Sequence, residues 1–142
     1  MPSNEEKIVK NGKVYAIIIR SDIKIDGVEF FTPEQYPFQL GLHIREVGND
    51  IRPHVHKKIK REIELSQEAL HIIYGKVEVD FFDEEKNKIA TIVLNSGDTM
   101  LLVRGGHGFK VLEKTKMIEV KQGPYEGIEK DKELLKSKFH KD

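Results

Sequence analysis

Short β-forming runs separated by turn residues constrain the fold of this chain more than any other feature of its sequence. They cover residues 14–20, 28–31, 38–46, 70–74, 77–82, 88–94, 99–103, 108–112 and 117–122. The breaks beside them carry turn formers such as Asn11-Gly12, Asp26-Gly27 and Ser96-Gly97, which are typical of short hairpin connections. The pattern therefore predicts an all-β fold of antiparallel strands.

The length of 142 residues predicts one domain. An open sheet of this many strands would leave exposed edges, and closing the sheet on itself removes them. We therefore expect a single small antiparallel β-barrel or jelly roll over residues 1–142, with its core at about 14–122. Near the end of the chain, Leu134, Leu135 and Phe139 are spaced as one apolar stripe, which predicts a helical tail over about residues 126–140.

The absence of cysteine limits the chemistry that the chain can perform. It excludes disulfides, thiolate zinc sites, iron–sulfur clusters and cysteine nucleophiles, so His, Asp and Glu must carry any metal or acid–base chemistry. Lys and Arg number 24, as do Asp and Glu, which gives a formal charge of zero. A chain without a positive field is not expected to bind nucleic acid.

The sequence also predicts no membrane partner. Apolar runs such as Ala16–Ile19 are far shorter than the roughly 20 residues that a transmembrane helix needs, and residues 1–6 lack the basic start of a signal peptide. We therefore expect a cytoplasmic protein. The run 14–19 is apolar on both faces of an extended strand, so we expect a homodimer in which a second copy covers one of these faces.

Three histidines have a sequence context that points to chemistry. His54 and His56 stand two residues apart, and His107 follows Gly105-Gly106. On an extended strand residues i and i+2 project to the same side, so the first two histidines can present two imidazole nitrogens to one point. An isolated pair of this kind is also common on exposed surfaces. A carboxylate from Glu68, which opens the next β-run, would complete a mixed site suited to Mn, Fe, Ni or Zn.

Two stretches of the chain resemble the sequence signatures of the cupin superfamily. The first runs from Gly48 through His54-Val55-His56 and Glu68 to Gly75, and the second runs from Gly97-Asp98 to His107. The resemblance implies a small antiparallel jelly-roll barrel. It also implies that one divalent transition metal (Zn, Mn, Fe or Ni) is held by His54, His56, Glu68 and His107.

The chain departs from the cupin pattern at three places. Residues 57–67 make the spacing between His56 and Glu68 longer than the family's, so Glu62, Glu64 and Gln67 are alternatives to Glu68. The turn before His107 is one residue short and lacks the usual proline. The family's asparagine after the last histidine is replaced by Val111.

A narrower resemblance concerns the ligand. Ser66-Gln67-Glu68, Gly105-Gly106-His107-Gly108-Phe109 and the run 118–125 are similar to a group of single-domain cupins associated with bacterial surface-polysaccharide gene sets. This resemblance implies a role in polysaccharide biosynthesis and a small-molecule ligand that is a sugar or a nucleotide-sugar.

Two further pairs of polar residues alternate with apolar ones on predicted strands. His43 and Arg45 share one face of the run 38–46, and Glu119 and Lys121 share one face of the run 117–122. If these faces line the barrel, Glu119 and His43 are candidate proton-transfer residues, and Arg45 and Lys121 are candidate substrate-binding residues. Otherwise they form surface contacts or exposed ion pairs.

The leading hypothesis is a metal-dependent enzyme that isomerises or epimerises a sugar or nucleotide-sugar. The metal would polarise a substrate oxygen while Glu119 or His43 moves a proton. With Fe(II) the same open positions would suit oxygenase chemistry. The alternative from another class is a cupin that binds a sugar without catalysis.

Overall fold

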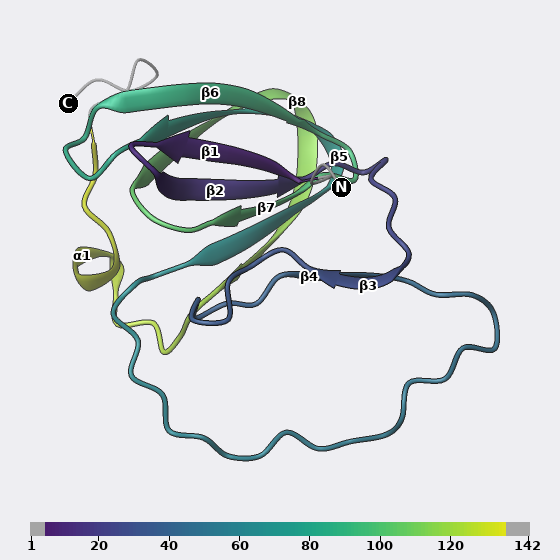
Figure 1. The fold of residues 1–142 in the computed structure, drawn as a ribbon. Coiled ribbons are helices and arrows are strands. Elements are labelled where there is room, and N and C mark those ends of the chain that lie inside the picture. The colour runs from purple at the N-terminus through teal and green to yellow at the C-terminus, as the bar shows by residue number, and fades with distance from the viewer. Residues whose placement is uncertain (1–4, 136–142) are drawn as a thin grey trace.

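The computed structural model describes residues 5–135, which are built almost entirely from antiparallel β-strands (Figure 1). The strands are β1 (Glu6–Lys10), β2 (Lys13–Ile19), β3 (Gly27–Phe30), β4 (Gly41–Ile44), β5 (Glu68–Phe82), β6 (Lys88–Asn95), β7 (Thr99–Leu102) and β8 (Gly106–Lys121). The prediction of an all-β antiparallel fold is confirmed at this level. The first strand, β1, has no counterpart among the predicted runs.

Six strands form one strongly curled sheet, a half-barrel, in the order β1-β2-β7-β5-β6 with β8 also paired to β5. The long strands β5 and β8 produce the curl, because each of them runs from one end of the sheet to the other. The first half of β5 pairs with β7, its second half pairs with β6, and β8 follows β5 along its length. Each of these long strands joins two of the predicted runs into one element.

The bend in the middle of β5 lies at Gly75, where the pairing with β8 shifts register between Ile72 and Val77. Gly75 has a φ of 110°, and a Cβ atom there would lie 2.4 Å from Thr115 Oγ1. Register shifts of this kind bend a strand and increase its twist. The glycine that interrupts the sequence pattern therefore bends β5 instead of ending it.

Two apolar clusters lie on opposite faces of β2. Ala16 and Ile18 belong to one cluster and Ile17 and Ile19 to the other. Residues 15–19 are buried within the chain itself, because β2 is paired with β1 and β7 and covered on both faces. The apolar character of this strand therefore gives no argument for a second copy, and the homodimer stays a prediction.

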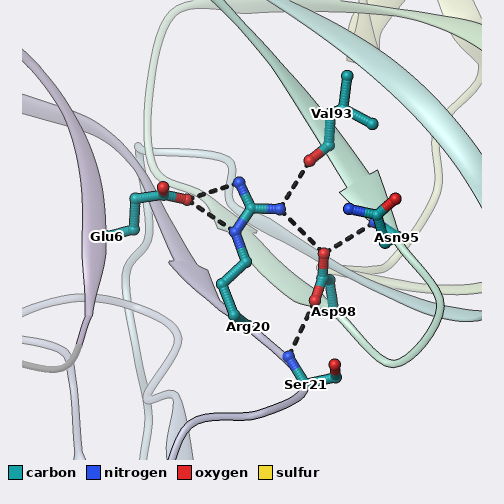
Figure 2. Close-up of polar contacts among 6 residues, drawn as sticks. All are labelled: Glu6, Arg20, Ser21, Val93, Asn95 and Asp98. Atoms are coloured by element: carbon teal, nitrogen blue, oxygen red, sulfur yellow. Dashed lines mark hydrogen bonds and ion pairs between the residues drawn. The ribbon is translucent and has the colours of Figure 1, made fainter.

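A polar network fastens the end of β2 to the turn between β6 and β7 (Figure 2). Asp98 is 2% exposed, and its carboxylate accepts hydrogen bonds from Arg20 Nη1 at 2.9 Å, Ser21 N at 2.9 Å and Asn95 N at 2.8 Å. Gly97 has a φ of 86°, and a Cβ atom there would meet Ser21 Cβ at 2.6 Å. The Gly97-Asp98 pair thus has a structural role in closing this turn.

The chain leaves the sheets between β4 and β5. Residues 46–66 contain no helix or strand, and Figure 1 shows them as a long open loop that runs away from both sheets. We call this segment the arm. Before it, β3 and β4 form a separate two-stranded sheet.

The prediction of a helical tail over about residues 126–140 is wrong for most of the residues that the structure describes. Only α1 (Ile128–Asp131) is helical, and it has no buried residue and no side-chain cap at Gly127. Short helices depend on tertiary packing for their stability, and α1 lacks it. Residues 132–135 are not helical, and residues 136–140, with Phe139, lie outside the described residues. Within 5–135 no helix has the length and apolarity required to cross a membrane.

Candidate functional site

A cavity of about 670 Å³ lies against one face of the curled sheet. Side chains at alternate positions of β5 and β8 form its walls, which is the periodicity of a single sheet face. The C-terminal segment 131–135 closes one side. The charged and ring-bearing residues in its wall are Glu68, Asp80, Phe82, Arg104, His107, Phe109, Glu119, Lys121, Asp131, Lys132 and Glu133.

Two residues of the predicted metal site meet in this cavity. Glu68 Oε1 lies 3.1 Å from His107 Nε2, and the two side chains are 14% and 29% exposed. An ionised carboxylate can only accept a hydrogen bond, so Nε2 of His107 carries the proton at this contact. The His107 ring also packs against the Phe109 ring, with 5.3 Å between the ring centroids. The pair is therefore held on two sides.

Several neighbours control the charge of Glu68. Burial alone would raise the pKa of its carboxyl group, but the hydrogen bond and charge of His107 lower it. The neighbouring Glu119 side chain and the charge of Lys132 act in the same direction. The net result is a pKa below the usual value for glutamate, so Glu68 is a carboxylate near neutral pH.

Glu119 and Lys121 lie on the same cavity wall, at the end of β8. Burial lowers the pKa of Lys121, but the hydrogen bond to Asp131 and the charges of Asp131 and Glu119 outweigh it and raise the pKa above the usual value. The Nζ atom is 3.3 Å from Asp131 Oδ2 and 4.7 Å from the centroid of the Tyr125 ring. Lys121 therefore presents a permanent positive charge beside the Glu119 carboxyl.

Two amide side chains at this end of the cavity are held in one orientation. Gln67 Oε1 accepts a hydrogen bond from Phe38 N at 3.2 Å, and Gln122 Oε1 accepts one from Gln67 N at 2.7 Å. Both Nε2 groups are buried and have no acceptor within residues 5–135. A buried donor without a partner costs about 1–3 kcal/mol, so each would be stabilised by an incoming oxygen atom.

The other two predicted metal ligands are placed elsewhere. His54 and His56 lie on the arm, where both are exposed. Their ring centroids are 5.2 Å apart, and His54 Nδ1 is 2.8 Å from Arg52 O. Neither is in the cavity wall. Among the described residues no group of three His, Asp or Glu side chains is placed to hold a metal ion.

The separation of the donor atoms of Glu68 and His107 can be compared with the geometry that a bound metal ion requires. Ligands at adjacent octahedral positions, each about 2.1 Å from the ion, are about 3 Å apart, which is close to the Glu68–His107 separation of 3.1 Å. These two residues would therefore suit neighbouring positions. Two donors are nevertheless fewer than the three or four of a protein metal site, so the residues as placed do not fit the ion, and the metal stays a prediction.

His43 and Arg45 lie outside the cavity. Both are exposed, and Arg45 donates from Nε to His43 Nδ1 at 3.4 Å and from Nη1 to Asn49 Oδ1 at 2.9 Å. This face of β4 contributes nothing to the wall of the cavity, so their catalytic and substrate-binding roles stay predictions.

Sequence reasoning missed several polar residues of the cavity wall as site candidates, among them Arg104, Gln122, Asp131 and Lys132. The alternation of the run 117–122 put Gln122 on the face opposite Glu119 and Lys121, and it reaches the cavity wall because it follows the last residue of β8. Arg104, Asp131 and Lys132 gave no such signal, because they lie outside the strands. Comparison of the chain with protein-family models, with curated proteins and with solved structures finds no match.

Proposed function

We propose that this protein is an enzyme that isomerises or epimerises a sugar or nucleotide-sugar by proton transfer. The observation that carries the proposal is the convergence of Glu68, His107, Glu119 and Lys121 on one cavity. Its volume of about 670 Å³ is within the range of about 300–1,000 Å³ of small-molecule sites. The sugar class rests on the resemblance to polysaccharide-associated cupins.

Each group has a role in such a reaction. Glu119 removes the proton from the carbon next to the substrate carbonyl. In isomerisation it returns that proton to the neighbouring carbon while the hydroxyl proton moves to the former carbonyl oxygen. In epimerisation His107 or water delivers a proton to the opposite face of the same carbon, and Glu119 keeps the one that it removed. The positive charge of Lys121 stabilises the negative charge that develops on the carbonyl oxygen. Glu68 orients His107, and this leaves Nδ1 of the ring to bind or exchange a proton with the substrate.

The oriented amides of Gln67 and Gln122 support a ligand rich in oxygen atoms. Their Nε2 groups are donors without acceptors in the described part of the chain, and sugar hydroxyl groups supply acceptors. We also propose that the half-barrel is the body of a cupin jelly roll, which closes when the arm packs against it. Closure of this kind is a condition for the predicted four-ligand metal site.

Solvent exchange tests the reaction. The protein is incubated in D₂O with a panel of sugars, sugar phosphates and nucleotide-sugars, and deuterium entry at carbon is followed by NMR. We expect exchange in the parent and a loss of about 10²-fold or more in Glu119→Gln. Glu113→Gln is the matched control, because Glu113 is on the same strand with its side chain 63% exposed, and it should retain exchange.

Two results would oppose the proposal. Equal exchange in the parent and Glu119→Gln would remove Glu119 as the base. Saturable binding of a sugar without exchange or product in any variant would favour the non-catalytic binding protein.

A further inference from the structure

The charged side chains of the cavity wall are mostly arranged in pairs. Wall carboxylates contact basic side chains in the pairs Glu68–His107, Asp80–Lys88, Asp131–Lys121 and Glu133–Lys86. The carboxylate that remains, Glu119, is the base of the proposed reaction. Arg104 and Lys132 also line the wall, and neither forms an ion pair with a carboxylate within residues 5–135. The cavity therefore contains two cations that are available to a ligand.

The guanidinium group of Arg104 is held at one end and open at the other. Its Nε donates a hydrogen bond to the carbonyl oxygen of Val14 at 3.0 Å, which fixes the direction of the planar group. Nη1 and Nη2 have no acceptor in the described part of the chain. These two groups form a fork that matches two oxygen atoms of one oxyanion. The side chain is half-buried, and the partial loss of water strengthens such charged contacts.

The register of the sheet places Arg104 on the same face as the acid–base groups. Leu102 of β7 lies opposite Glu68 of β5. The N–H of Val103 donates to Tyr15 O at 2.9 Å, so the extended pairing with β2 continues one residue past the end of β7. Alternation along an extended chain therefore returns Arg104 to the face of Leu102 and Glu68, which is the face that lines the cavity.

Lys132 supplies the second charge from the C-terminal segment. It belongs to the cavity wall, and its charge lowers the pKa of Glu68, so its ammonium group lies on the Glu68 side of the cavity. Lys132 is exposed and therefore lies where the cavity meets solvent. Its side chain can turn toward a ligand without breaking an ion pair of the described chain.

We propose that Arg104 and Lys132 bind a phosphate group, and that the substrate of this cavity is a phosphorylated sugar. The proposal rests on the proposed function and narrows its substrate class. A phosphate monoester carries a charge of about −1.5 to −2 near neutral pH, which matches two cations, whereas a carboxylate carries a single charge and a neutral sugar carries none. A sugar phosphate and the diphosphate of a nucleotide-sugar share this chemistry.

Titration with the phosphate group alone tests the site before the sugar is known. Isotope-labelled protein is titrated with inorganic phosphate and with pyrophosphate, and the backbone amide signals are followed by NMR. We expect saturable shifts that are largest at residues 104–108 and 131–133. Arg104→Gln and Lys132→Gln should each weaken the binding of pyrophosphate by about 10-fold or more, because each removes a charged donor.

Two cations outside the cavity wall give matched control variants. Lys130 lies two residues before Lys132, with its side chain 74% exposed, and Arg61 is exposed on the arm. Lys130→Gln and Arg61→Gln should bind pyrophosphate as the parent does. Arg104→Gln also loses the contact with Val14, so circular dichroism checks its fold. Lys132→Gln gives an independent measurement, because Lys132 has no side-chain hydrogen bond to lose within residues 5–135.

The sugar phosphates and nucleotide-sugars of the deuterium-exchange panel distinguish the two sources of the phosphate. The class whose affinity falls in Arg104→Gln supplies the group, and an equal fall in both classes shows that the site accepts either. Unphosphorylated sugars should bind the parent and Arg104→Gln equally.

The proposal is overturned if neither phosphate nor pyrophosphate gives a saturable shift. It is also overturned if Arg104→Gln and Lys132→Gln bind pyrophosphate as tightly as the two controls, which would indicate only general attraction to surface charge. These results would leave the exchange reaction itself open, since a neutral sugar can still exchange. Saturable phosphate binding without deuterium entry from any sugar would instead support the phosphate site and contradict the reaction.

Discussion

Glu68 Oε1 contacts His107 Nε2 at 3.1 Å although the two residues belong to opposite ends of the paired strands β5 and β8. His107 is opposite Phe81, and Phe81 is thirteen positions after Glu68 on β5. In a flat sheet this separation would be about 43 Å, at about 3.3 Å per residue. The contact therefore exists only because the sheet curls back on itself and encloses the cavity.

The Glu68–His107 pair should stabilise the curled sheet. In a double-mutant cycle with Glu68→Gln and His107→Gln, we expect a coupling free energy of about 1 kcal/mol, because both side chains are mostly shielded from water. Urea unfolding of the four proteins measures it. The Lys76–Glu113 pair, 3.8 Å apart with side chains 41% and 63% exposed, is the control and should couple by less than about 0.5 kcal/mol. Equal coupling in the two cycles would contradict the expectation.

Asp98→Asn should lower the free energy of unfolding by about 2–4 kcal/mol. The substitution removes the charge that faces Arg20 and places an NH₂ group among donors from Ser21 and Asn95 (Figure 2). Denaturant unfolding followed by circular dichroism measures the change. Asp22→Asn, at an exposed neighbouring position, should stay within about 0.5 kcal/mol of the parent, and a similar loss in both variants would show that the network is not the cause.

Gly105→Ala should destabilise the protein by about 2 kcal/mol or more. Gly105 has a φ of 73°, and a Cβ atom there would lie 2.3 Å from the carbonyl oxygen of Phe82, so the turn that leads to His107 must shift. Gly108→Ala is the matched control on the other side of His107, because a Cβ atom at Gly108 meets nothing within 4 Å. Melting temperatures of the two variants give the comparison, and an equal effect would contradict this account of the turn.

A low pH should weaken the Lys10–Asp83 interaction, which joins β1 to the turn after β5. The hydrogen bond from Lys10 Nζ, 2.8 Å from Asp83 Oδ2, together with the backbone N–H of Asn87, lowers the pKa of Asp83. The resulting stability is present above the unfolded pKa of about 3.9 and is lost as the pH falls through the lower folded value.

Urea unfolding of the parent and Asp83→Asn between pH 2 and pH 7 tests this linkage. The difference between the two free energies of unfolding should be largest near neutrality and shrink below about pH 4. Asp26→Asn, at an exposed position, should give a small difference that does not follow this course. A difference for Asp83→Asn that is constant with pH would refute the role of its charge.

Local patterns in the sequence determined much of the secondary structure. Alternation and turn residues located the strands, because side-chain periodicity and backbone preferences act over a few residues. The same alternation placed Glu119 and Lys121 on one face of β8, and that face lines the cavity. The glycine interruption at Gly75 was misleading, since a bulge and a strand end have the same local signal.

The tertiary structure alone decided which distant residues meet. The contact between Glu68 and His107 follows from the accumulated curl of a sheet whose strands pair across long sequence separations. The positions of Arg104 and Lys132 in the cavity wall follow from how turns and the C-terminal segment pack against that sheet. The sequence by itself determined the local conformations and the faces of the strands, since these depend on near neighbours. Packing of the whole chain decided the cavity, and it left His54 and His56 on the arm.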